Sequence, residues 1–449
     1  MQKNDEIIIS ITDITSDGNG VGRYEGLAVF VPMTAVGDTA LVHIVKVKKT
    51  YAYGKLISVQ TPSKDRILND CPVFNRCGGC VYRHINYTAE CNLKHNHVEN
   101  CIKRIGTIDI TAKKIIPAKA QAFYRNKAQF PISQNGNVGF FANRSHRIIE
   151  CDNCLLQPEE FSTIAKIVSA WIKKFSVSVY DEVKHMGLLR HLYLRKGEKT
   201  GEIMVVLVIN GDTIPHFEPL KEELIKAYPE NIKSIQLNIN KLNTNVILGK
   251  ECVTLYGESY INDILCGVKV RISALSFYQV NHDMTEILYK QAVRYAQPEK
   301  KNILDLYCGA GTIGLSMAKQ AQSIIGVEII PEAILDAKQN ALNNNIENAR
   351  FICADAAQAA KQLSKENIHP DVVILDPPRK GCEESLLKTV AEKFSPQRIV
   401  YVSCDPATLA RDCAVLKKFD YKLKEYTPVD LFPRTGHVET VSLFLKSKE

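Results

Sequence analysis

Short apolar runs alternate with polar positions along the first sixty residues, and glycine and aspartate separate them. The runs are IIISITDIT, LAVFVP, ALVHIVKVKK and YAYGKLISV. Alternation with a period of two between such breaks predicts half-buried strands, and about five of them would close into a small OB-like β-barrel. Lysines and tyrosines are interleaved near residues 46–53, as in barrels that bind nucleic acid. We therefore expect a nucleic-acid-binding barrel at residues 1–60.

A mixed pattern fills residues 61–275. A helical pattern at 87–106 is followed by strand-like runs at 122–149, a second helix in FSTIAKIVSAWIKKF, and further strands in HLYLRKG, GEIMVVLVIN and SIQLNIN. Helices and strands mixed in this way predict an α+β central domain. Basic side chains at positions 125, 127, 144, 146 and 147 are expected to line a surface that contacts phosphates.

The pattern changes again at residue 276. Apolar runs such as NILDL, SIIGV, VVIL and RIVYVS each alternate with an amphipathic helix. Strict alternation of strand and helix predicts an open, mostly parallel, doubly wound sheet. The expected fold class is thus a multidomain α/β protein, with its third domain at residues 276–449.

Composition and charge limit the cellular compartment and the kinds of partner that we expect. No run of about 18 apolar residues occurs, so no membrane helix is expected, and the chain is predicted to be cytoplasmic. The formal net charge of +8 suits a polyanionic partner without requiring one. Fourteen cysteines in such a chain indicate metal binding or thiol chemistry, because disulfides are rare in the cytoplasm.

Three cysteines stand in one tight loop, CPVFNRCGGC, at Cys71, Cys77 and Cys80. Their thiols can converge on one metal centre, and a fourth ligand must come from outside the loop. The candidates for it are Cys91, Cys101, Cys151 and Cys154. Zinc uses the same residue types, so spacing leaves zinc and an iron–sulfur cluster both open.

Two strands end on chemistry-bearing residues. The run IVYV is followed by Ser403 and Cys404, and Asp405-Pro406 then opens a helix; upstream, VVIL ends at Asp376. Ligands and reactive groups of α/β sheets collect at the carboxyl ends of strands. A thiol and a carboxylate are therefore expected together at one sheet edge, with Cys404 as a catalytic candidate.

The turn Gly309 to Gly314 fits the G-x-G-x-x-G pattern, which alone is a weak sign of a dinucleotide site. Acids lie on or at the ends of four successive strands: Asp305, Glu328, Asp355 and Asp376. This pattern resembles the class I S-adenosylmethionine (SAM) methyltransferases. A pyrophosphate would be repelled by so much negative charge, whereas a cationic sulfonium would be attracted.

Across almost its whole length the chain resembles the RNA uracil-5-methyltransferases, nearer the 23S rRNA enzymes than the tRNA branch. The resemblance rests on CPVFNRCGGC, FYQVN, DLYCGAGTIGL, LDPPRKG, VSCDPATLARD and GHVET, and on a first domain similar to the RNA-binding TRAM barrel. It implies transfer of a methyl group from SAM to carbon 5 of a uridine, with a cysteine bonded to carbon 6 during the reaction.

The resemblance also implies roles for particular residues. It makes Cys404 the nucleophile, Glu439 the general base and Phe277 the aromatic that stacks on a flipped uridine. It places SAM against Gln279, Tyr307, Glu328 and Asp376. It assigns a [4Fe–4S] cluster to Cys71, Cys77, Cys80 and Cys154.

Other interpretations remain at this stage. One alternative is a tRNA (uracil-5-)-methyltransferase. A second is a non-catalytic rRNA-binding assembly factor, which would keep the domain without turnover. A third, a radical iron–sulfur enzyme, would leave Cys404 unexplained. The favoured expectation is a monomer that acts on a structured loop of 23S rRNA.

Overall fold

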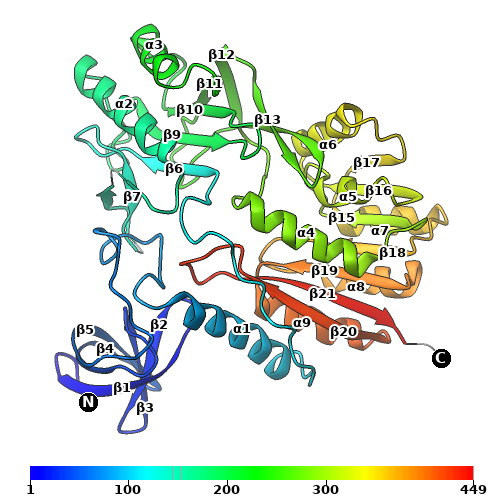
Figure 1. Ribbon diagram of the computed structural model, residues 1–449, viewed down its shortest axis with the longest axis horizontal. Coiled ribbons are helices and arrows are strands. Elements are labelled where there is room, and N and C mark those ends of the chain that lie inside the picture. The colour runs from blue at the N-terminus through cyan, green and yellow to red at the C-terminus, as the bar shows by residue number, and fades with distance from the viewer. Residues whose placement is uncertain (144, 152, 448–449) are drawn as a thin grey trace.

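In the computed structural model, which describes residues 1–143, 145–151 and 153–447, the N-terminal strands close into a barrel (Figure 1). Its strand order is β1-β2-β3-β5-β4, and only the pair β3–β5 is parallel. Alternate residues of the first strand, Ile7, Ile9 and Ile11, fill the barrel core, as the period of two predicts. The strands are β1 (Glu6–Ile14), β2 (Asn19–Tyr24), β3 (Leu27–Pro32), β4 (Thr39–Val47) and β5 (Tyr51–Thr61).

A five-stranded sheet in the order β12-β11-β10-β9-β6 forms the middle of the molecule. Its strand β10 is buried along its whole length, and the apolar sides of α2 and α3 pack with it in one core. The elements of this region are β6 (Lys127–Pro131), β7 (Gly139–Phe141), β8 (Ile148–Glu150), α2 (Glu159–Phe175), β9 (Leu189–Lys196), β10 (Ile203–Ile209), α3 (Phe217–Ala227), β11 (Ile232–Ile239), β12 (Glu251–Gly257), β13 (Tyr260–Leu265) and β14 (Val268–Ser273).

The C-terminal region is a seven-stranded sheet in the order β17-β16-β15-β18-β19-β21-β20, flanked by helices (Figure 1). All neighbouring pairs are parallel except those that involve β21. Its elements are α4 (His282–Ala296), β15 (Asn302–Leu306), α5 (Thr312–Met317), β16 (Ser323–Glu328), α6 (Pro331–Asn343), β17 (Ala349–Cys353), α7 (Ala356–Lys365), β18 (Val372–Leu375), α8 (Glu384–Thr389), the π-helical turn η1 (Val390–Phe394), β19 (Arg398–Ser403), α9 (Pro406–Lys417), β20 (Tyr421–Val429) and β21 (Glu439–Lys446).

The helix α1 (Tyr87–Arg104) packs on the C-terminal sheet region although it precedes the central strands. Its residues Val98 and Ile102 share a core with Leu409 and Cys413 of α9, and Figure 1 shows the two helices side by side. The amphipathic pattern predicts that one face of this helix is buried, and the fold supplies α9 as the partner. The boundaries expected at residues 60 and 275 stay a prediction.

The predicted architecture, a barrel followed by an α+β region and a doubly wound α/β domain, is confirmed. Since β15, β16, β18 and β19 run parallel, their carboxyl ends lie along one edge of the sheet. Among the described residues, no helix is long and apolar enough to cross a membrane.

Candidate active site and cysteine cavity

The glycine-rich turn after β15 forms an open cradle at this sheet edge. Gly309 and Gly311 have φ angles of 55° and 78°, and Tyr307 has 67°, all in the left-handed region that glycine tolerates best. A side-chain carbon at Gly309 would meet no heavy atom within 4 Å. The backbone at Gly309 is therefore open to a ligand, whereas Gly311 packs closely against the Phe351 ring.

Two acids support this cradle. Asp305 Oδ2 accepts a hydrogen bond from the Gly314 N–H at 3.0 Å, while its Oδ1 is buried with no hydrogen-bond partner in the described part of the chain. Leaving a buried carboxylate oxygen unpaired is costly, so this atom fits a ligand that brings a donor or a positive charge. Glu328 Oε2 accepts from the Gly309 N–H at 3.2 Å, and this bond fixes the turn to the end of β16.

The remaining two acids of the predicted row have different surroundings. Asp355 caps α7, since its Oδ1 accepts from the N–H groups of Ala357 and Gln358. Asp376 follows β18, and burial raises its pKa to about 7. Burial, reinforced by the neighbouring Asp376, raises the pKa of Asp305 to about 8. A cation bound among these groups would favour their ionised forms.

Cys404 and Glu439 meet beside these acids. Cys404 is half-buried between the end of β19 and α9, whose first turn is capped by Asp405. Glu439 begins β21 and is 4 % exposed. Burial and the nearby Glu439 raise the pKa of Cys404 to about 12, and burial and Asp376 raise the pKa of Glu439 to about 8. Without a positively charged ligand, the Cys404 thiol and the Glu439 carboxyl group can therefore both stay protonated at neutral pH.

Arg379 is a residue whose position sequence reasoning missed. It lies four residues after β18, and its positive charge opposes the raised pKa values of both Cys404 and Glu439. Its Nη2 lies 3.4 Å from Nε2 of His437. The sequence does contain a signal for this position. Arg379 directly follows Asp376-Pro377-Pro378, and that turn carries it to the same sheet edge.

Two further residues predicted for the site, Phe277 and Gln279, lie in one short segment and differ in how exposed they are. Phe277 is 65 % exposed and Gln279 is buried. Between them, Tyr278 donates to Asp263 Oδ2 at 2.8 Å in the interior. The Phe277 ring is therefore free to contact a ligand, while the buried Tyr278 anchors the backbone next to it.

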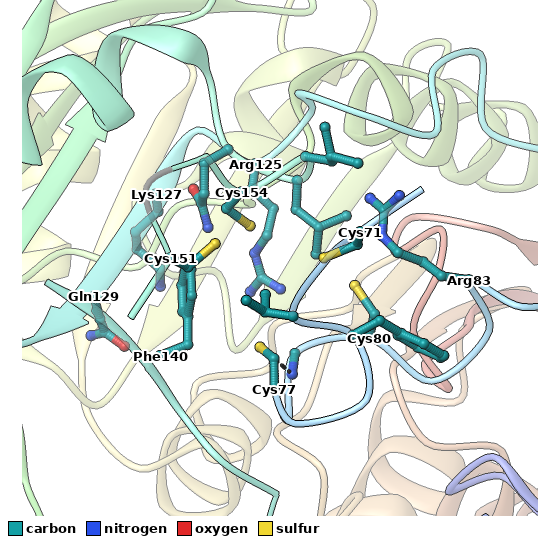
Figure 2. A pocket seen from close by; sticks show the side chains of 16 residues that line it. Cys71, Cys77, Cys80, Arg83, Arg125, Lys127, Gln129, Phe140, Cys151 and Cys154 are labelled. Carbon is teal, nitrogen blue, oxygen red and sulfur yellow. Dashed lines mark hydrogen bonds between the residues drawn. The ribbon is translucent and has the colours of Figure 1, made fainter. Parts of the chain in front are cut away.

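Five cysteine side chains surround one cavity of about 200 Å³ between the cysteine loop and β6 (Figure 2). They are Cys71, Cys77, Cys80, Cys151 and Cys154. Cys91 and Cys101 instead lie on α1, outside this cavity, so two of the four candidates for a fourth ligand are removed.

Three basic side chains, Arg83, Arg125 and Lys127, also line the cysteine cavity. Arg125 and Lys127 line the cavity and are both half-buried, so the phosphate-binding surface expected for them stays a prediction; Arg144 lies outside the described residues.

Hydrogen-bond donors point at several of these sulfur atoms. The Gly79 N–H lies 3.4 Å from Cys77 Sγ, Arg83 interacts with the Cys80 thiol, and backbone groups of Leu156 and Gln157 donate to Cys154. Burial raises the pKa of Cys80 to about 11 and that of Cys154 to about 12. In the described residues, no three histidine, cysteine or acidic side chains are grouped closely enough to hold a single metal ion.

Comparison with known proteins agrees with this architecture. Residues 86–448 match the family tRNA (uracil-5-)-methyltransferase, and residues 2–57 match the TRAM domain. An uncharacterized RNA methyltransferase of Halalkalibacterium halodurans is 44 % identical over 448 residues, which cover 99 % of this chain and 97 % of that protein. Another from Staphylococcus epidermidis is 42 % identical over 455 residues, 100 % of this chain and 99 % of its own.

A solved structure is similar over the same length. The Pyrococcus abyssi tRNA (uracil-54, C5)-methyltransferase, in complex with S-adenosyl-L-homocysteine, superposes with a TM-score of 0.78 at 28 % identity, over 97 % of this chain and 99 % of that one. The barrel, the methyltransferase fold and the family model therefore agree. The chain belongs to the RNA (uracil-5-)-methyltransferase family and is a SAM-dependent RNA methyltransferase with an N-terminal TRAM barrel.

Proposed function

We propose that this enzyme methylates carbon 5 of a uridine in 23S rRNA through a covalent adduct between Cys404 and carbon 6 of the base. The observation that carries the proposal is the placing of a thiol and a carboxyl group on adjacent strands, next to a glycine cradle lined with acids. Each of these groups has a part in the reaction.

The chemistry requires a nucleophile and a base. Carbon 5 of uracil is too weak a nucleophile to accept a methyl group unaided. Addition of the Cys404 thiolate to carbon 6 places the electron pair of the carbon 5–carbon 6 double bond on carbon 5 as an enolate. After carbon 5 has gained the methyl group, the Glu439 carboxylate removes its proton, the double bond re-forms, and the thiolate leaves.

SAM supplies the methyl group on a positively charged sulfonium. The residues proposed to hold it are Gln279, Tyr307, Glu328 and Asp376. The unpaired Oδ1 of Asp305 and the raised pKa of Asp376 support a cationic ligand here, because a positive charge stabilises both carboxylates. The same charge would lower the pKa of Cys404 and of Glu439 toward the values that catalysis needs.

Phe277 is proposed to stack on the target base. A uridine must leave its helix or loop stack before a protein group can reach carbon 6, and an exposed aromatic ring gives it a new partner. The 65 % exposure of Phe277 beside the buried Gln279 supports this role.

The rRNA assignment rests on the TRAM barrel and the cysteine loop, which we associate with the rRNA enzymes. A specific observation favours tRNA as the second candidate. The similar Pyrococcus abyssi structure, described as a tRNA methyltransferase, covers 97 % of this chain, so its likeness is not limited to the methyltransferase domain. The two substrates have to be compared directly.

We further propose that the cysteine cavity holds a [4Fe–4S] cluster through Cys71, Cys77, Cys80 and Cys154. The comparisons name no such cluster, so the proposal rests on the donor set. The cavity of about 200 Å³ has room for a polynuclear centre, and buried cations face the thiols. Cys154 is proposed as the fourth ligand because it precedes Leu155-Leu156-Gln157, as in the family motif, and two backbone N–H groups are directed at its sulfur.

The test of the reaction is a covalent trap. The enzyme and SAM are incubated with fragments of 23S rRNA, or with tRNA transcripts, that carry 5-fluorouridine. Fluorine on carbon 5 cannot be removed as a proton, so the adduct should persist on a denaturing gel. An adduct with rRNA that is absent in Cys404→Ala supports the whole proposal. An adduct with tRNA alone keeps the chemistry and changes the substrate, and no adduct with either RNA rejects Cys404 as the nucleophile.

A further inference from the structure

The β20–β21 connection, residues 430–438, leads directly into Glu439 and is bound by distant parts of the chain. Four successive carbonyl groups in it accept hydrogen bonds from different segments. The pairs are Leu431 with Asn281 Nδ2 at 2.9 Å, Phe432 with Lys94 Nζ at 3.1 Å, Pro433 with Tyr124 Oη at 2.9 Å, and Arg434 with the N–H groups of Val81 and Tyr82 at 2.9 and 3.2 Å. The connection is therefore a junction of the α1, α4 and cysteine-loop segments.

Buried charges form the centre of this junction. Glu90, Lys94 and Asp430 are 0, 2 and 0 % exposed. Lys94 Nζ lies 2.8 Å from Glu90 Oε1 and 2.7 Å from Asp430 Oδ1. Arg434 completes the set, because its backbone N–H donates to Glu90 Oε1 at 2.6 Å and its Nη1 lies 3.4 Å from Glu90 Oε2. Two cations and two anions leave the network neutral.

The network lies next to the strand pair that contains Glu439, where the β20–β21 connection begins and ends. Asp430 directly follows Val429, and Val429 is the cross-strand partner of Glu439. Asp430 is held from both sides, since Tyr87 Oη donates to its Oδ2 at 2.7 Å and Lys94 binds its Oδ1. A buried ion network is rarely more stabilising than apolar packing, so its value lies in fixing one arrangement of the loop.

We propose that the network of Glu90, Lys94, Asp430 and Arg434 is a positioning device for Glu439, and that it couples proton removal from carbon 5 to the cysteine loop. The coupling passes through the Arg434 carbonyl, which binds the backbone immediately after Cys80. Since this inference names the supports of the general base, it rests on the reaction proposed above.

Cys404 is held by hydrogen bonds that include none of the four network residues, although α1 packs on α9. It lies between β19 and α9, where Ser403 Oγ donates to the Asp405 carbonyl at 3.0 Å and Asp405 caps the helix. Disturbing the network should therefore displace the base and spare the nucleophile. Addition and methyl transfer would continue, and the methylated adduct would accumulate on ordinary uridine because its proton is removed slowly.

The experiment uses two variants of the full-length enzyme. Glu90→Gln keeps the shape of the side chain and removes one charge. Glu90→Gln with Lys94→Met removes one charge of each sign, so the net charge of the buried set stays zero, while Asp430 keeps its hydrogen bond from Tyr87. The matched control is Glu160→Gln in α2, whose carboxylate pairs with Lys196 Nζ at 2.7 Å in the central region.

Both variants should lower kcat on uridine RNA, and a displacement of the base by 1 Å corresponds to a loss of about 100-fold. The SAM Kd and the rate of adduct formation should match those of the control, and a methylated RNA–protein adduct should appear on the gel. Variants that lose SAM binding or adduct formation together with turnover would show a general structural role and overturn the inference. Normal turnover in both variants would overturn it as well.

The behaviour of the wild-type enzyme distinguishes failure of the positioning role from failure of the proposed reaction. If wild-type protein forms an adduct with 5-fluorouridine RNA and the variants turn over normally, only the positioning role is rejected. If wild-type protein forms no adduct with any RNA, the proposed reaction is rejected and the positioning role with it.

Discussion

Cys404 and Glu439 lie directly beyond the last cross-strand pair of two antiparallel strands, because β19 and β21 stay in register up to the pair Ser403 and Thr440. The next residue on one strand is the thiol, and the preceding residue on the other is the carboxyl group. The register of the two strands therefore brings both residues to the same end of the strand pair, where Cys404 follows β19 and the β20–β21 connection leads into Glu439. Their roles can be separated by substitution.

Glu439→Gln should remove the base and keep the nucleophile. We expect kcat to fall by about 10²- to 10⁴-fold, the usual contribution of a general base. A methylated adduct should accumulate with unmodified uridine RNA and be visible by denaturing gel and mass spectrometry. Cys404→Ala is the control and should give no adduct. Unchanged kcat in Glu439→Gln would show that another group removes the proton.

The stability of the ligand-free enzyme should fall as pH rises from about 5 to 8, in part because of Glu439. Its folded-state pKa of about 8 lies above the unfolded value of 4.5, so the folded chain binds more protons in this window. The stabilisation is therefore fully present below pH 4.5 and is lost as pH rises through about 8. Glu439→Gln should make the dependence of Tm on pH shallower. Identical Tm profiles for the variant and the wild type would contradict the raised pKa.

Asp376→Asn should weaken SAM more than S-adenosylhomocysteine. The first ligand carries a sulfonium charge and the second does not, so removal of a nearby carboxylate affects them unequally. Isothermal titration of both ligands gives the ratio of their Kd values. Asp371→Asn is the matched control at the opposite end of β18, where the carboxylate accepts from the Asn302 N–H at 2.9 Å. Equal weakening of both ligands by Asp376→Asn would remove the electrostatic argument.

Cys80→Ser should abolish the iron–sulfur cluster. Protein purified without oxygen should contain about four iron and four sulfide per chain, with the visible absorption of a [4Fe–4S] centre. Cys91→Ser is the control, because that thiol is buried on α1 outside the cavity and its loss should leave the iron content unchanged. A wild-type protein with one zinc ion and no sulfide would replace the cluster with a zinc site.

Phe277→Ala should reduce kcat/KM for RNA while Phe277→Trp retains it. Stacking of a base on an aromatic ring contributes about 1–3 kcal/mol, which corresponds to roughly 5- to 150-fold. The control is Leu275→Ala, a neighbouring side chain that is 38 % exposed. If both alanine variants lose the same amount, the effect comes from the segment and not from the ring.

The gathering of site residues at the carboxyl ends of the parallel strands could be predicted from the local sequence pattern alone. Because β18 and β19 are adjacent and parallel, Asp376 and Cys404 reach the same edge, as the alternation of strands and helices indicated. The place of Glu439 depends on the register of an antiparallel strand, which spacing does not encode. Its role came from the resemblance of GHVET to the family motif.

The buried network shows where local pattern misleads. Glu90 and Lys94 are four residues apart on a helix, a spacing typical of an exposed ion pair. They are buried because Asp430 lies against them, and nothing near residue 90 in the sequence signals that contact. In the same way, the pattern of α1 predicts a buried face and leaves its partner α9 unspecified.

The bonds that hold the β20–β21 connection join residues that lie far apart, with 336 positions between Lys94 and Asp430 and 344 between Glu90 and Arg434. During synthesis, the barrel, the cysteine loop and α1 emerge long before β20 and β21 do. Until those strands have left the ribosome, Glu439 is absent from the site, and Glu90 and Lys94 of α1 have each other but lack Arg434 and Asp430. The TRAM barrel is therefore synthesised well before β21, the strand that carries the proposed base, so the proposed catalytic pair is one of the last parts of the molecule to form.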